Sequence, residues 1–141
     1  MKKIIGLSLL VSFFFVSCKK DSPATVCTLS STSILGSYKT TSVLYKADAA
    51  TAEVDIFTSY SACQKDDLLT FVTGGLYAST EGATACTPAN NSNGTWSLSG
   101  STMTLDGTDT ASISDFSCSG FKVKTTDPVT GETFTITLVK Q

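Results

Sequence analysis

The feature that most constrains the fold of this chain is a two-residue alternation of apolar and polar side chains, which recurs in short runs from residue 35 to residue 140. Successive side chains of a strand point to opposite faces, so this period predicts strands with one apolar and one polar face. Glycine, asparagine and serine separate the runs, which is typical of antiparallel hairpins. Eight strands are predicted, over residues 35–45, 68–73, 76–80, 94–99, 102–106, 111–117, 121–126 and 133–140.

The alternation also predicts which side chains are buried. The apolar members that fall in register are Leu69, Phe71, Trp96, Leu98, Met103, Leu105, Phe121, Val123, Phe134, Ile136 and Leu138. The residues between them are mostly threonine, serine and lysine. Eight sequential strands with one dry face favour an all-β fold, either a closed antiparallel barrel or a sandwich, because both hide the apolar side and protect the edge strands.

The connections between the predicted strands are mostly short. Gly74-Gly75 and Gly100-Ser101 each suit a two-residue hairpin turn, because glycine adopts positive φ without steric cost. Asp127 to Gly131 is expected to form a longer turn. The long connection over residues 47–60 is rich in alanine and is expected to form either a short helix that plugs one end of a barrel or an irregular loop.

The N-terminus has the order of an export signal. Lys2 and Lys3 precede an apolar run over residues 4–16, and small Ser17 and then Cys18 follow it. The run would form only about 20 Å of helix, which is too short to cross a bilayer, so residues 1–17 are predicted to be a signal peptide.

Residues 15–18, Phe-Val-Ser-Cys, resemble the bacterial lipobox. This resemblance implies cleavage before Cys18 and acylation of Cys18; an ordinary secreted protein and an uncleaved anchor are the alternatives. We therefore expect residues 18–33 to be a lipidated cysteine with a flexible tether rich in serine and threonine, and residues 34–141 to be the folded domain.

Composition excludes several classes of function. Without residues 1–17 the chain has eight lysines, twelve acidic residues and no arginine, a formal charge of −4, so it lacks the basic clusters that bind nucleic acid. Histidine is absent, which excludes histidine-dependent nucleophiles and imidazole-ligated metal sites. No motif indicates a catalytic, metal or cofactor site, so we expect a protein that is not an enzyme, binds no cofactor and is a monomer.

The sequence has four cysteines besides Cys18, namely Cys27, Cys63, Cys86 and Cys118. An even number of cysteines in an exported chain predicts disulfides, here two, for which three connectivities are possible. A bridge from Cys63 to Cys86 would enclose one strand pair. A bridge from Cys27 to Cys118 would pin the end of the tether to the far side of the fold. A reactive thiol is the alternative, although no CxxC motif is present.

Several segments together resemble the lipocalin-like domains of bacterial lipoproteins, which are small relatives of the calycin barrels. The matching segments are residues 34–38 (ILGSY), 63–67 (CQKDD) before 69–71 (LTF), 75–77 (GLY), Cys86, 94–96 (GTW) and Leu98. The resemblance implies an eight-stranded antiparallel up-and-down barrel with a bridge between Cys63 and Cys86. The family usually has tryptophan where Tyr38 stands, and it implies no particular substrate.

Two sets of residues are candidate sites. Asp66 and Asp67 are adjacent carboxylates, but neighbours in a strand point to opposite faces, so a structural role at a strand entrance is expected. The aromatic residues Tyr38, Phe71, Tyr77 and Trp96 either line a lipophilic pocket or fill the barrel.

Two functions follow from these observations. The first is a lipid-anchored, non-catalytic protein of a Gram-negative outer membrane, whose barrel binds a small apolar or amphipathic ligand. The second is a filled scaffold that contacts another envelope protein or a glycan.

Overall fold

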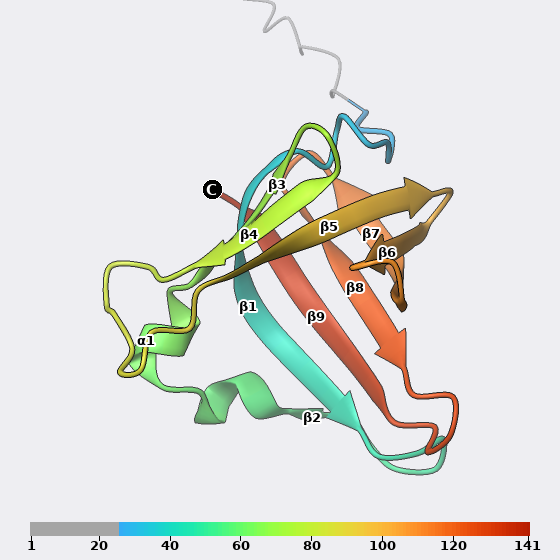
Figure 1. Ribbon diagram of the computed structural model, residues 1–141. Coiled ribbons are helices and arrows are strands. Elements are labelled where there is room, and N and C mark those ends of the chain that lie inside the picture. The colour runs from blue at the N-terminus through green and yellow to red at the C-terminus, as the bar shows by residue number, and fades with distance from the viewer. Residues whose placement is uncertain (1–25) are drawn as a thin grey trace, which may run out of the picture.

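The alternating runs form strands that pair in sequence order, in a computed structural model that describes residues 26–141. The strands are β1 (Gly36–Lys46), β2 (Val54–Asp55), β3 (Leu68–Val72), β4 (Leu76–Thr80), β5 (Ser92–Ser99), β6 (Thr102–Leu105), β7 (Asp109–Ser117), β8 (Gly120–Thr126) and β9 (Thr133–Lys140). Because β1 pairs with β9 as well as with β3, the sheet closes on itself (Figure 1). The predicted eight-stranded antiparallel barrel is confirmed, and β2 is a two-residue addition beside the far end of β1.

The connections differ in detail from the expected turns. Val72 pairs with Leu76, so the β3–β4 turn has three residues, 73–75, rather than two. Gly74 and Gly75 there have φ of +84° and +74°, which side chains with a Cβ rarely adopt. The β5–β6 turn is the expected two-residue Gly100-Ser101.

The long connection from β1 to β3 contains two short helical turns, η1 (Ile56–Ser59) and α1 (Ala62–Lys65). In Figure 1 this connection runs along the side of the barrel, next to β1. No residue of η1 is buried, so this segment does not supply the expected plug for a barrel end.

Bulges in β1 and β7 shift which side chains point inward. The register of β1 against β9 shifts between Thr40 and Ser42. Tyr38 and Val43 are therefore both buried, although they lie five positions apart and would point to opposite faces of a regular strand. The register of β7 against β8 shifts after Ser114, and Phe116 then packs against the core.

Side chains fill the barrel core. The buried cluster consists of Ile34, Tyr38, Phe71, Trp96, Met103, Ala111, Ile113, Phe121, Val123 and Leu138, with the remaining predicted apolar side chains of β3, β5, β6 and β9 largely packed around it. The rings of Tyr38, Phe71 and Phe121 meet one another at centroid distances of 5.0–6.4 Å, in edge-on and tilted arrangements. Such geometry is favourable for aromatic pairs and leaves little free space between them.

The up-and-down order gives the barrel two distinct ends. The turns 73–75, 100–101 and 118–119, the start of β1 and the end of β9 lie at one end, which we call the mouth end. The connections 47–67, 81–91, 106–108 and 127–132 join strands at the other, which we call the far end, and the first of them returns along the side of β1. Segment 26–35 runs across the mouth end, at the top of Figure 1.

Candidate functional site at the mouth end

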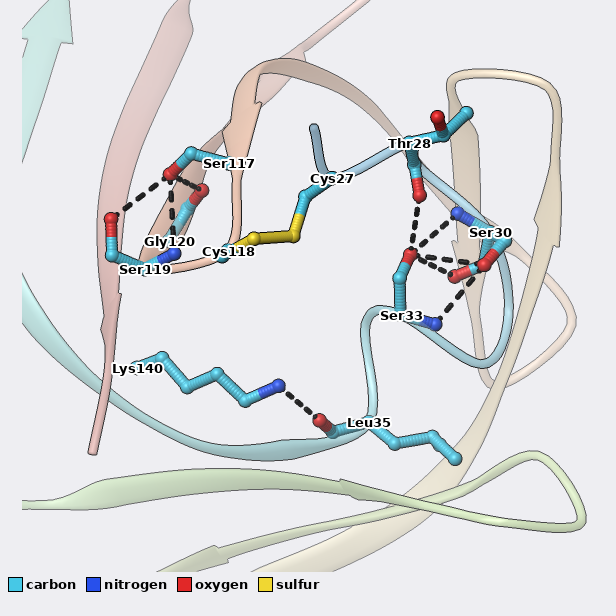
Figure 2. The surroundings of a disulfide bond; sticks show 10 residues. All are labelled: Cys27, Thr28, Ser30, Ser33, Leu35, Ser117, Cys118, Ser119, Gly120 and Lys140. Atoms are coloured by element: carbon cyan, nitrogen blue, oxygen red, sulfur yellow. Dashed lines mark hydrogen bonds between the residues drawn. A yellow bond between two sulfur atoms is a disulfide. The ribbon is translucent and has the colours of Figure 1, made fainter. Parts of the chain in front are cut away.

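Segment 26–35 is fastened to the barrel at both of its ends. Near its start, a disulfide joins Cys27 to Cys118 in the β7–β8 turn, with the two Cα atoms 5.3 Å apart (Figure 2). Near its finish, Ile34 is fully buried, and its carbonyl oxygen accepts a hydrogen bond of 2.9 Å from the hydroxyl of Tyr38. This segment therefore covers part of the mouth end and is fixed to the domain, whereas composition predicts a flexible tether over residues 26–33.

Hydroxyl side chains fix the turn within this segment. The amide of Ser30 donates to the Ser33 hydroxyl at 2.8 Å, and that hydroxyl donates to the carbonyl of Thr28 at 2.8 Å (Figure 2). Leu29 and Leu35 pack against the core from the same segment. Serine is common in such turns because its hydroxyl satisfies nearby backbone groups.

A lysine closes the seam between the ends of β1 and β9. The Lys140 ammonium donates to the carbonyl of Leu35 at 2.7 Å and lies 5.7 Å from the centroid of the Tyr38 ring (Figure 2). A Cβ at Gly36 would come within 2.7 Å of the Lys140 side chain, so glycine leaves room for it. Burial raises the pKa of Tyr38 above its ordinary value, because the phenolate would lose its hydration.

An apolar pocket of about 340 Å3 opens between segment 26–35, the β3–β4 turn and β5. Its lining residues are Ser31, Thr32, Leu35, Val72, Thr73, Gly74, Gly75, Trp96, Ser97 and Leu98. The indole N–H of Trp96 donates to the carbonyl of Leu76 at 3.0 Å, which holds the ring in place under the β3–β4 turn. The volume lies at the lower end of the range usual for small-molecule sites, and the lining joins apolar surface to a few hydroxyls.

The structure brings three of the four candidate aromatic residues together. Tyr38, Phe71 and Trp96 are buried neighbours, with the Phe71 and Trp96 ring centroids 5.4 Å apart. They pack as core, and of the four only Trp96 also lines the mouth pocket. Val72, Ser97 and Leu98 line the pocket from β3 and β5, and of these the alternation had indicated only Leu98. The remaining lining residues come from segment 26–35 and from the β3–β4 turn.

The fourth aromatic residue, Tyr77, belongs to a polar contact toward the far end. Its hydroxyl donates to Asp106 at 2.8 Å, and the other oxygen of Asp106 accepts from the amide of Thr95 at 2.8 Å. The hydrogen bond from Thr95, followed by that from Tyr77, holds the pKa of Asp106 below its usual value, and the bond to Asp106 raises the pKa of Tyr77. These contacts attach the β6–β7 turn to β4 and β5.

The second disulfide joins Cys63 of α1 to Cys86 in the β4–β5 loop, with Cα atoms 5.3 Å apart. Asp66 supports the same junction, because its carboxylate accepts from the amide of Thr84 at 2.8 Å. Asp66 and Asp67 each have one buried carboxylate oxygen without a hydrogen-bond partner. A hollow of about 550 Å3 beside this disulfide is lined by residues of α1 and of the β4–β5 loop, outside the barrel.

The predicted signal peptide, residues 1–17, lies outside the described residues. Cys18 lies outside residues 26–141, so its acylation stays a prediction. Within the described residues, no cluster of three or more cysteine or acidic side chains is arranged to hold a metal ion. No helix in that same part of the chain is long and apolar enough to cross a membrane.

The closed antiparallel barrel of eight strands, with an apolar interior, defines an up-and-down β-barrel protein, a class that includes the lipocalins. A family model described as the lipocalin-like domain matches residues 34–137, and the chain therefore belongs to the lipocalin-like domain family. No curated protein and no solved structure matches the chain.

Proposed function

We propose that the protein is a lipoprotein of the bacterial envelope, anchored through Cys18, whose barrel binds a small apolar or amphipathic molecule at the mouth end without catalysing a reaction. The observation that carries the binding role is the mouth pocket, where Leu35, Val72 and Trp96 offer apolar surface beside hydroxyl groups. Such a lining suits a ligand with an apolar body and one polar group.

Export is supported by the sequence and by the disulfides. Cys18 follows a basic and then apolar N-terminus, in the order of a lipoprotein signal. Both disulfides would be reduced in a typical bacterial cytosol and persist in the envelope. The intact mass of the chain purified from a Gram-negative host tests the anchor: acyl chains on Cys18 are expected, and a Cys18→Ser variant should lack them.

The single tryptophan allows ligand binding in the pocket to be measured by fluorescence. Trp96 is the only tryptophan in the sequence, and it lines the pocket, so a ligand that enters should change its fluorescence. We would export a Cys18→Ser chain behind a cleavable secretory leader and titrate it with dodecanoate and with dodecylphosphocholine. Native mass spectrometry of the same chain would detect any molecule carried from the cell.

A matched pair of variants separates the pocket from the rest of the surface. Ser97→Phe places a ring in the pocket and should weaken binding of the probes at least tenfold. Ser114→Phe makes the same change at an exposed position on β7, away from the pocket, and should change binding less than twofold. Equal effects of the two substitutions would refute the pocket as the binding site.

The packed interior favours a second function, a scaffold that presents its surface to another envelope protein or to a glycan. Tyr38, Phe71 and Phe121 fill the interior, the space in which an eight-stranded barrel otherwise holds one small ligand. A bare mass in native spectra, together with Trp96 fluorescence that does not respond to either probe, would support this scaffold over the binding role.

A further inference from the structure

The two ends of the barrel differ sharply in charge. Segment 26–35 and the turns 73–75, 100–101 and 118–119 at the mouth end contain no charged side chain. The far-end connections contain the acidic residues Asp48, Glu53, Asp55, Asp66, Asp67, Glu81, Asp106, Asp127 and Glu132. Within residues 26–141 the other two acidic residues are Asp109, where β7 starts at the far end, and Asp115, which pairs with Lys122 at 2.8 Å.

Within residues 26–141 three of the six lysines lie on strands toward the mouth end, and the other three, Lys46, Lys65 and Lys124, lie toward the acidic far end. Lys39 lies near the start of β1, Lys122 near the start of β8, and Lys140 at the end of β9. An anionic surface would therefore attract the mouth end and repel the far end, over distances up to the Debye length of about 8–10 Å.

Exposed apolar side chains at the mouth end have uncharged surroundings. Val72 and Leu76 face each other across the β3–β4 turn and are 43% and 51% exposed, and Val26 is exposed at the start of segment 26–35. The far end also exposes Val54 and Val129, but each lies within three residues of two acidic side chains. Only the mouth end combines exposed apolar residues with the absence of acidic ones.

The proposed anchor leaves the fold at this same end. Nine residue steps separate Cys18 from Cys27, and the disulfide to Cys118 holds Cys27 at the mouth end. Nine steps span at most about 30 Å when fully extended. β1 has eleven residues and is about 33 Å long. To turn its far end to the membrane, the domain would need a tether that is nearly fully extended and runs along the barrel.

We infer that the mouth end docks on the phospholipid surface, with the β3–β4 tip, residues 72–76, in contact with the interface. This inference rests on the proposed acylation of Cys18. Docking buries Val72 and Leu76 among headgroups, brings the mouth-end lysines near anionic phosphates and keeps the acidic far end in water.

The test uses the full acylated chain in vesicles of phosphatidylethanolamine and phosphatidylglycerol at a 3:1 ratio. Leu76→Trp places a reporter at the mouth-end tip, and Val129→Trp places a matched reporter on the exposed far-end turn. The unsubstituted protein, with Trp96 alone, supplies the baseline for subtraction. Acyl-brominated phosphatidylcholine, added to a fifth of the lipid, should quench the Leu76→Trp reporter at least twice as strongly as the Val129→Trp reporter.

A second measurement uses the unsubstituted chain, because an introduced tryptophan can itself increase the contact between the β3–β4 tip and the lipid. In nanodiscs of the same lipids, a gadolinium-chelating headgroup lipid should broaden the amide signals of residues 73–75 more than those of residues 129–131. Equal quenching and equal broadening at the two ends, or the reverse order, would overturn the docking while leaving the anchor intact. An intact mass without acyl chains on Cys18 would overturn the anchor itself, and the docking inference with it.

Discussion

The disulfide between Cys27 and Cys118 should contribute more to stability than the one between Cys63 and Cys86, because it closes the longer loop. The two bridges span 91 and 23 residues, and the shorter loop lies inside the longer one. With the inner bridge intact, the path between Cys27 and Cys118 shortens to 91 − 23 = 68 residues. The chain-entropy relation then gives about 4.4 kcal/mol for the outer bridge and about 3.4 kcal/mol for the inner one.

The comparison requires two variants, Cys27→Ser with Cys118→Ser and Cys63→Ser with Cys86→Ser. Each replaces one bridge by hydroxyls of similar size, so the chain composition changes equally in both. Against a typical free energy of unfolding of about 5–15 kcal/mol, either loss is large, and the outer variant should be the less stable by about 1 kcal/mol.

Urea unfolding followed by circular dichroism measures both losses on the oxidised proteins. In each variant the free energy of unfolding should fall more steeply with urea concentration, because a denatured chain with fewer cross-links exposes more surface. Fits must therefore leave this slope free, and thermal unfolding supplies an independent ranking. Equal losses, or a greater loss for the Cys63 and Cys86 variant, would refute the reasoning from loop length.

Three further predictions concern single side chains. Tyr38→Phe removes the hydroxyl that donates to Ile34 and should lower the free energy of unfolding by about 1–3 kcal/mol in urea titrations, whereas a loss below 0.5 kcal/mol would show that water replaces this contact. Phe71→Ala empties the centre of the aromatic cluster and should cost about 3–5 kcal/mol in the same assay, against less than about 1 kcal/mol for Val72→Ala on the outer face. Because the pKa of Asp106 is lower in the folded protein than in the unfolded chain, where it is about 3.9, ionised Asp106 stabilises the fold above that pH. This stability is lost as pH falls through the lower pKa of the folded state. The urea midpoint should therefore fall less steeply between pH 5 and pH 2 for Asp106→Asn than for the unsubstituted chain.

The sequence predicted the strands well where the two-residue period runs without interruption. In β5, for example, Trp96 and Leu98 point inward as expected. The period gives the wrong face wherever a bulge inserts one residue, so no count from Tyr38 could place Val43 on the same side. Bulges depend on how neighbouring strands fit together, and this information is not local in the sequence.

The candidate site was harder to predict than the fold. Composition indicated a tether over residues 18–33, because serine and threonine dominate it, yet Leu29 packs against the core and Ser33 is fixed in a hydrogen-bonded turn. The available signal was Cys27, whose bridge to a distant cysteine requires its neighbours to lie on the domain. The pocket also depends on the β3–β4 turn, which approaches segment 26–35 only once the barrel closes.

The mouth pocket and the docking surface share Val72, and this overlap allows the two proposals to be tested against each other. Ser97 lines the pocket without belonging to the tip, so Ser97→Phe should weaken probe binding and leave docking unchanged. Leu76 belongs to the tip without lining the pocket, so Leu76→Asp should reduce the headgroup broadening of residues 73–75 and leave probe affinity within twofold. Val72→Asp should reduce both, because a carboxylate there faces the apolar pocket and the anionic lipid at once. If Val72→Asp reduced only probe affinity or only the headgroup broadening, Val72 would belong to one of the two sites and not to both. Unchanged probe affinity would contradict the role of Val72 in the pocket, and unchanged broadening would contradict its role in docking.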